Sequence, residues 1–268
     1  MRARGPSSWL TWVLVCLAIL WCVPLLWALA GSVASDVYAG RPTPSSLTWD
    51  HWRSLGQAGL LRSLANSVLV AFISAATGTA MALTVAVHFL VRRTPRSGMV
   101  LGLFVGKLVP VAVLLIPQVW LLRSTLGPNT LLGLVLVHSL TAFLVALVLL
   151  VPGAQGLRDQ YLDEMGVLGI GMAAFVRRIV FPEMRTHIAL AFVVTFMTSW
   201  SEFAYANLLL TLPARRTLPV LLGQFMTAYQ MLWGQMYALT VVSVAVTLAV
   251  LLVGFALVNR AMTAPKSE

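Results

Sequence analysis

The sequence has 268 residues, of which 59% are hydrophobic and only 10% are charged. Soluble globular domains have about 25% charged residues, so this composition excludes an ordinary soluble enzyme and places most of the chain in lipid. The formal net charge is +10, yet the basic residues flank apolar segments and do not alternate with exposed aromatic residues. We therefore expect a membrane protein with cations at its helix ends, and no nucleic acid as a partner.

Six apolar segments are each long enough to cross a hydrocarbon core about 30 Å thick as a helix. The first apolar run is longer than that of a cleaved signal peptide, so we expect it to remain as a helix. Its two cysteines, Cys16 and Cys22, suggest neither a disulfide framework nor a metal site. The sequence predicts one all-α integral membrane domain over residues 1–268, with spans at 9–30, 66–90, 99–121, 131–151, 188–210 and 236–258.

The basic residues also predict the orientation. With the N-terminus inside, the inside segments hold eleven Lys and Arg residues and the outside segments hold six. The short loop with Arg92, Arg93 and Arg96 is the clearest case, because short cytoplasmic loops are enriched in basic residues. We expect both termini in the cytoplasm. On the outside, Thr48 or Asp50 is suited to cap a short helix lying on the membrane.

No set of residues in the sequence suggests an enzyme. The four histidines lie in four separate regions, and the sequence predicts no catalytic residues and no metal ligands. Gly102 and Gly106 precede Lys107, but a phosphate-binding loop needs a longer glycine spacing and a Ser or Thr after the lysine. The GxxxG spacing instead favours close helix packing. This chain is therefore expected to bind no ATP or other cofactor itself.

Two charged residues, Lys107 and Glu202, lie within predicted spans, where a charge usually faces a protein interior or a water path. Trp200, Ser201 and Phe203 surround the acid, so this group could line a solute pathway, with the aromatic rings stacking on a sugar. Two alternatives remain open: a structural ion pair between the two charges, and helix packing around one buried acid.

A half-apolar, half-charged segment at 153–187 holds four of the eight acidic residues. We expect a helix at 161–168, a break at Gly169 and Gly171, and a second helix at 172–181 that Pro182 ends or kinks. Met165, Leu168 and Phe175 would form an apolar ridge that fits a groove in a partner. An amphipathic helix lying on lipid is the alternative.

The spacing of Asp163, Gly169 and the closing run at 177–182 resembles the EAA loop of ABC-importer permeases. The stretches LANSVLVAF, LVPVAVLLIPQVWLL, SWSEF and RRTLPVLLGQF are similar to the carbohydrate branch of that family, the relatives of the smaller membrane subunit of the maltose transporter. The sequence departs from the family pattern at Glu164, Met165 and Leu168 in the loop and at Ser201 in SWSEF.

The resemblance implies a type I ABC importer permease fold with a cytoplasmic coupling helix, in a bacterial inner membrane. It implies four partners: a second related permease subunit, two ATPase subunits that bind ATP and Mg, and an extracytoplasmic solute-binding protein. The solute is expected to be a sugar or oligosaccharide, with a polyol or a glycerol-phosphate-like solute as the alternative. An ion-gradient-driven secondary transporter is the alternative of another class. The residues expected to dock the ATPase are Asp163, Glu164, Met165, Leu168, Gly169, Phe175, Arg177, Arg178, Ile179 and Pro182.

Overall fold

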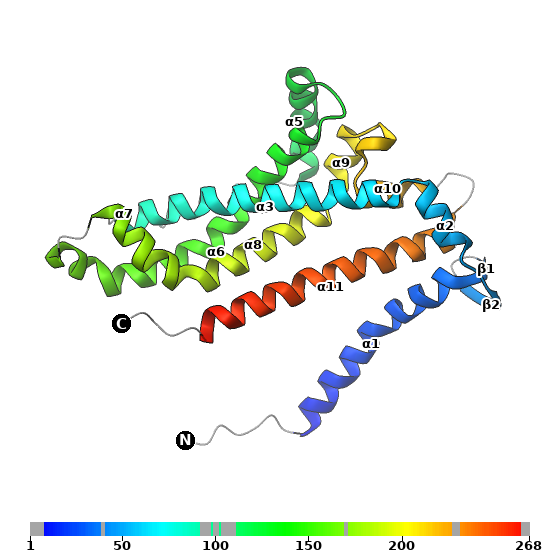
Figure 1. Ribbon diagram of the computed structural model, residues 1–268, viewed down its shortest axis with the longest axis horizontal. Coiled ribbons are helices and arrows are strands. Elements are labelled where there is room, and N and C mark those ends of the chain that lie inside the picture. Colours follow the sequence, from blue (N-terminus) through cyan, green and yellow to red (C-terminus); the bar gives the residue numbers. More distant parts are fainter. Residues whose placement is uncertain are drawn as a thin grey trace. The chain divides into compact units, whose positions relative to one another are not determined.

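The computed structural model describes residues 8–38, 41–91, 98, 102, 111–168, 171–226 and 231–263. These residues form long helices, several short helices and one two-stranded hairpin (Figure 1). The chain divides into two compact units. One comprises Met1–Leu60 and Leu221–Val246, and the other comprises Leu61–Val220 and Thr247–Glu268.

The first unit contains helix α1 (Ser8–Val33), strands β1 (Ala34–Tyr38) and β2 (Arg41–Leu47), helix α2 (Asp50–Gln57) and the first part of helix α11 (Trp233–Thr263). The two strands are antiparallel, with Asp36 opposite Thr43. The sequence of β2 does not predict a strand, since it contains two prolines, which are tolerated only where a strand edge is free. Both strands of a two-stranded sheet have such an edge.

The short helix expected near Thr48 is present as α2, but its N-cap is Trp49, which makes no side-chain cap hydrogen bond, so neither Thr48 nor Asp50 caps it. The hydroxyl of Thr48 accepts the backbone N–H of Asp50 at 3.1 Å and donates to its carboxylate at 2.9 Å. The helix is joined to the hairpin by His51, whose Nε2 lies 2.9 Å from the carbonyl oxygen of Ala34.

The second unit is built on α3 (Leu60–Val91), α6 (Leu131–Leu168) and α8 (Phe181–Trp200); α6 and α8 lie side by side in Figure 1. Small and hydroxyl-bearing residues join these helices. Gly78 of α3 faces Ala142 of α6 so closely that a Cβ at Gly78 would lie 2.7 Å from the backbone nitrogen of Phe143. Thr77 and Ser139 share a hydrogen bond of 2.7 Å between the same two helices. Membrane helices often associate through such small and polar residues, because lipid provides no hydrophobic drive for their packing.

The prediction of a multi-pass helical membrane protein is confirmed. Among the described residues, five helices are long and apolar enough to cross a membrane, and a sixth apolar helix is shorter. The shorter one lies within α5 (Val111–Leu126), and the first part of the predicted span 99–121 lies largely outside the described residues. The five candidate spans are Trp9–Val33, Leu60–Leu90, Leu131–Leu157, Ala173–Trp200 and Trp233–Arg260.

The segment 153–187 is continuous with the membrane helices on both sides of it. The predicted fourth span ends at residue 151, but α6 continues through Pro152 to Leu168. On the other side of the turn, α7 (Met172–Phe175), a π-helical stretch η1 (Val176–Val180) and α8 follow one another directly. The expected helix–break–helix pattern is therefore present, but its two helices are the ends of membrane helices.

Pro182 does not end the second helix. It lies in the first turn of α8, directly after the π-helical stretch η1. A proline inside a helix lacks an N–H group and clashes with the carbonyl group four residues earlier, and π-bulges are a common local response to such an interruption. The wider π-helical turn at Val176–Val180 relieves the clash with Pro182, and the chain remains helical through the proline.

The predicted fifth span, 188–210, is interrupted. Helix α8 ends at Trp200, and a separate short helix α9 (Ala204–Leu209) follows. After α9 come a 3-10 turn η2 (Pro213–Arg215) and α10 (Leu218–Gln224). The interruption at residues 201–203 contains Glu202, the acid predicted within this span.

Candidate functional site

Glu202 explains why the chain breaks between α8 and α9. Its Oε1 accepts the backbone N–H of Tyr205 at 2.9 Å, and its Oε2 accepts that of Ala206 at 3.3 Å. The first N–H groups of any helix lack partners within the helix, and a carboxylate there also interacts favourably with the helix dipole. The acid therefore caps α9.

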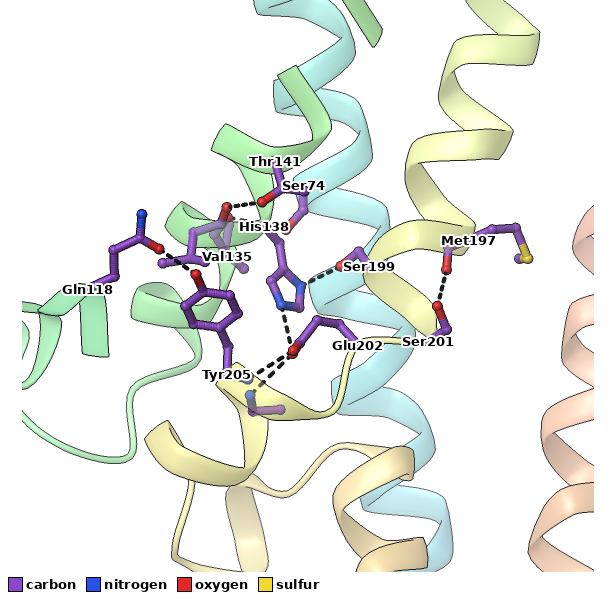
Figure 2. Close-up of polar contacts among 12 residues, drawn as sticks. Ser74, Gln118, Val135, His138, Thr141, Met197, Ser199, Ser201, Glu202 and Tyr205 are labelled. Carbon is purple, nitrogen blue, oxygen red and sulfur yellow. Dashed lines mark hydrogen bonds and ion pairs between the residues drawn. The ribbon is translucent and has the colours of Figure 1, made fainter. Parts of the chain in front are cut away.

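The same carboxylate contacts His138 from α6. Nε2 of the imidazole lies 3.3 Å from Glu202 Oε2, and Nδ1 lies 2.6 Å from Ser199 Oγ on the last turn of α8. Figure 2 shows the ring between these two partners. An ionised carboxylate can only accept, so Nε2 donates to Glu202, and in a neutral ring the Ser199 hydroxyl then donates to Nδ1.

Tyr205 extends this group of contacts to α5. Its hydroxyl donates to Oε1 of Gln118 at 2.6 Å, and the two side chains point toward each other in Figure 2. The polar network of Gln118, His138, Ser199, Glu202 and Tyr205 thus joins α5, α6, α8 and α9. Burying a charge near the bilayer centre costs about 2.5–3.5 kcal/mol on insertion scales, so a buried acid needs such partners. The Glu202 side chain is 20% exposed and His138 only 4%.

The residues beside Glu202 face different surroundings. The Trp200 ring is buried and stacks on Phe196, with centroids 6.1 Å apart and an interplanar angle of 15°. Ser201 is exposed and donates to the carbonyl oxygen of Met197 at 3.0 Å, while Phe203 is 43% exposed. The structure therefore presents Ser201 and Phe203 outward and packs Trp200 inside this chain. Lys107 lies outside the described residues, so its expected place in a solute pathway, or in an ion pair with Glu202, stays a prediction.

Glu202 was predictable from the sequence, but the other four members of the network were not predicted. They lie on four helices, α5, α6, α8 and α9, and their contacts depend on how these helices pack: Gln118, His138, Ser199 and Tyr205. The available signal was His138 itself, a titratable residue in the middle of a predicted span. Such residues are rare in membrane helices and usually face the protein interior.

The residues expected to dock an ATPase lie around the turn between α6 and α7. Phe175 is fully buried, packed within the second unit together with Leu90, Leu150 and Met184. Its side chain therefore packs the end of α7 into the core of the second unit. The other members are placed as follows: Asp163, Glu164, Met165 and Leu168 lie in the last turns of α6, Gly169 lies outside the described residues, Arg177 and Arg178 are exposed, and Ile179 and Pro182 are half-buried.

A second polar cluster fixes the segment that follows α9. Asn129 Oδ1 accepts the backbone N–H groups of Thr211 and Leu212 at 2.6 and 2.7 Å. The amide of Asn66 donates to the carbonyl oxygen of Arg216 at 2.9 Å, and Ser67 Oγ accepts the N–H of Leu218 at 2.7 Å. Side chains from α3 and from the α5–α6 turn thus hold this irregular segment.

Comparison with known proteins identifies the family. The model of the family described as "binding-protein-dependent transport system inner membrane component" matches residues 78–264. The chain belongs to this family. The permease is thus a multi-pass inner-membrane protein, and it is the non-catalytic membrane subunit of a binding-protein-dependent ABC importer.

Two relatives are similar over most of their length. The maltose/maltodextrin transport system permease protein MalG of Escherichia coli (strain K12) is 30% identical over 264 residues, which cover 88% of this chain and 87% of MalG. The lactose transport system permease protein LacG of Rhizobium radiobacter is 25% identical over 265 residues, which cover 96% and 94%.

A solved structure supports the fold. The permease superposes with a TM-score of 0.72 on a chain from the crystal structure of a bacterial ABC transporter involved in the import of the acidic polysaccharide alginate. The match covers 95% of this chain and 99% of that chain at 13% sequence identity. At this identity the comparison establishes the ABC importer permease fold alone.

Proposed function

We propose that this permease moves a sugar or an oligosaccharide across the bacterial inner membrane, and that residues 1–268 form a single permease domain of the type I importer fold with both termini in the cytoplasm. The observation that carries the solute class is the similarity to permeases named for maltose and lactose, which extends over the region that contains the network. The interrupted fifth span supports a pathway there, since broken helices in membranes occur where they line a cavity or are buried in protein.

Ser201, Glu202 and Phe203 are the residues proposed to face the pathway. A sugar has many hydroxyl groups and apolar ring faces, so it suits a hydroxyl, a carboxylate oxygen and an aromatic ring placed together. Ser201 and Phe203 are exposed, and Glu202 is partly exposed. Lys107 and Trp200 remain proposed members of the pathway. Trp200 would act by packing against Phe196, as it does in this chain.

The α6–α7 turn is the proposed coupling element. Two ATPase subunits would bind ATP and Mg and dock at this turn, a second related permease subunit would complete the membrane part, and a solute-binding protein would deliver the solute outside. Arg177 and Arg178 are exposed on η1, which follows α7, and there they can pair with acidic groups of a partner. Because α6 and α8 continue directly from this turn into the membrane, a movement of the turn displaces the helices that carry His138 and Ser199.

The solute class is tested by uptake into proteoliposomes that contain the complex purified with its own partners. We expect ATP inside the vesicles to drive uptake of a labelled oligosaccharide, with unlabelled sugars competing and polyols or glycerol phosphate not competing. Competition by a polyol or a glycerol phosphate alone would overturn the sugar proposal while leaving the importer family in place.

The docking role is tested separately by the double substitution Gly169→Pro and Asp163→Lys. Proline at the turn and a reversed charge on α6 are expected to leave membrane insertion intact and to abolish co-purification of the ATPase. An unchanged amount of co-purified ATPase would contradict docking at this turn.

A further inference from the structure

His138 is a buried titratable residue to which the proposed transport mechanism gives no role. It lies on α6, is 4% exposed, and contacts two residues that are separated from it by 61 and 64 positions. Both contacts are made through ring nitrogens, so the imidazole uses its full capacity for hydrogen bonds.

One partner of His138 lies before the helix break, and the other lies within it. Ser199 is on the last turn of α8 before the break, and Glu202 lies within the break and caps α9 after it. Ser201 and Phe203, which are exposed, flank Glu202. One rigid ring on α6 is therefore tied both to the end of α8 and to the start of α9 (Figure 2).

The other contacts of Glu202 in this network do not reach α6. Its carboxylate otherwise accepts the N–H groups of Tyr205 and Ala206, and its own N–H donates to the carbonyl oxygen of Ser199, so these bonds stay within its own stretch of chain. Without the imidazole, the cap of α9 would persist, but Glu202 would lose its hydrogen bond to α6. Among the hydrogen bonds of Glu202 within the described residues, the one from His138 ties the break to α6.

We propose that His138 is a positioning residue that holds the break at residues 201–203 against α6 and so sets the direction in which Ser201 and Phe203 face the solute pathway. The proposal rests on the proposed function only in naming that pathway. It assigns no proton transfer to the imidazole. The requirement is a side chain at position 138 with hydrogen-bonding groups that reach both Ser199 and Glu202.

Two substitutions of similar bulk, His138→Phe and His138→Gln, are expected to give different results. In His138→Phe the space stays filled, but both polar partners lose their contact, and unpaired buried polar groups favour a different local arrangement. In His138→Gln an amide retains one donor group and one acceptor group, so the tie is at least partly restored. Thr141→Val is the matched control one turn along α6, because the Thr141 hydroxyl donates to the carbonyl oxygen of Val137 in its own helix.

The experiment measures the exposure of the break directly. The reporter is Ser201→Cys in a chain that also carries Cys16→Ser and Cys22→Ser, which remove the native thiols. The full-length permease in its purified complex is reconstituted into vesicles, and the rate of reaction with a charged methanethiosulfonate is followed. We expect His138→Phe to change this rate by about fivefold or more, the factor that corresponds to a shift of about 1 kcal/mol. His138→Gln and Thr141→Val are expected to stay close to the parent rate.

A rate in His138→Phe equal to that of the parent would overturn the proposal, and so would a His138→Gln rate that departs as far as that of His138→Phe. If His138→Phe does not accumulate in the membrane, His138→Asn replaces it, since the shorter amide reaches only one of the two partners, and the same change in rate is expected. The thiol reaction needs neither ATP nor a known solute. A failure of the sugar proposal would therefore appear in the uptake competition and leave this result unaffected.

Discussion

Asn129 Oδ1 accepts two hydrogen bonds from Thr211, one from its backbone N–H at 2.6 Å and one from its hydroxyl at 3.0 Å. These bonds join the α5–α6 turn to the segment after α9. Asn129 adopts a positive φ of 61°, a conformation in which asparagine is one of the few favoured residues apart from glycine. Its own N–H donates to the carbonyl oxygen of Leu209 at 3.0 Å. Backbone conformation and side-chain chemistry thus both favour asparagine, or another short side chain with an acceptor oxygen, at this turn.

Asn129→Ala should loosen the segment after α9. Alanine cannot accept the N–H groups of Thr211 and Leu212, and it is strained at positive φ, so we expect opening of the segment to become easier by about 1–2 kcal/mol. Trypsin cleavage after Arg215 or Arg216 in purified permease should accelerate by about 5–30-fold when opening precedes cleavage. Asn129→Asp keeps an acceptor and tolerates positive φ, so it should cleave at nearly the parent rate. Equal cleavage of all three proteins would contradict this clamp.

Gly78→Ala should weaken the contact between α3 and α6. A Cβ at this position would lie 2.7 Å from the backbone nitrogen of Phe143, so the helices would have to separate. Overpacking of this kind costs about 1–3 kcal/mol, and thermal unfolding in detergent should shift to lower temperature. Gly156→Ala on α6 is the control, because a Cβ there meets no atom within 4 Å. A Gly78→Ala protein as stable as Gly156→Ala would show that the helices are not this close.

Phe175→Ala should lower the stability of the permease, whereas Arg178→Glu should weaken its binding to the ATPase. Phe175 is fully buried, so its truncation leaves a cavity and should cost about 3–5 kcal/mol of stability. Arg178 is exposed, so reversing its charge should leave thermal unfolding nearly unchanged and reduce the amount of ATPase that co-purifies. Loss of ATPase from a stable Phe175→Ala protein, without loss from Arg178→Glu, would contradict this division of roles.

The hydrogen bond between Tyr205 and Gln118 should be measurable by a double-mutant cycle. Tyr205→Phe removes the hydroxyl, Gln118→Ala removes the acceptor, and the double variant corrects for other losses. We expect a coupling energy of about 0.6–1.5 kcal/mol, the range between average polar contacts in membrane proteins and typical hydrogen bonds. Unfolding in mixed micelles supplies the four values. A coupling energy near zero would show that α5 and α9 are held together by apolar contacts.

The sequence was sufficient for the features that depend on local composition. Apolar length predicted the membrane helices, and the glycines near 169–171 predicted the break between α6 and α7. The turn chemistry near Thr48 predicted a short helix, although Trp49 and not Thr48 or Asp50 is its N-cap. Family resemblance added the importer class, which the family match confirmed.

The features that depend on packing were not predictable in the same way. The continuation of α6 through Pro152 depends on the surrounding helices, since proline alone is expected to interrupt a helix. The burial of Phe175 also depends on distant residues, such as Leu90 and Met184. The network around Glu202 requires His138 on α6 to lie next to the break between α8 and α9. The local sequence around either residue does not indicate this contact.

The most direct test of the account is ATP hydrolysis by the reconstituted complex, measured with and without its solute-binding protein and a sugar. The account predicts strong stimulation only when the binding protein and an oligosaccharide are both present, and loss of that stimulation in the Gly169→Pro, Asp163→Lys double variant. Hydrolysis that ignores every sugar but responds to another class of solute, or that remains fully stimulated in the double variant, would contradict it.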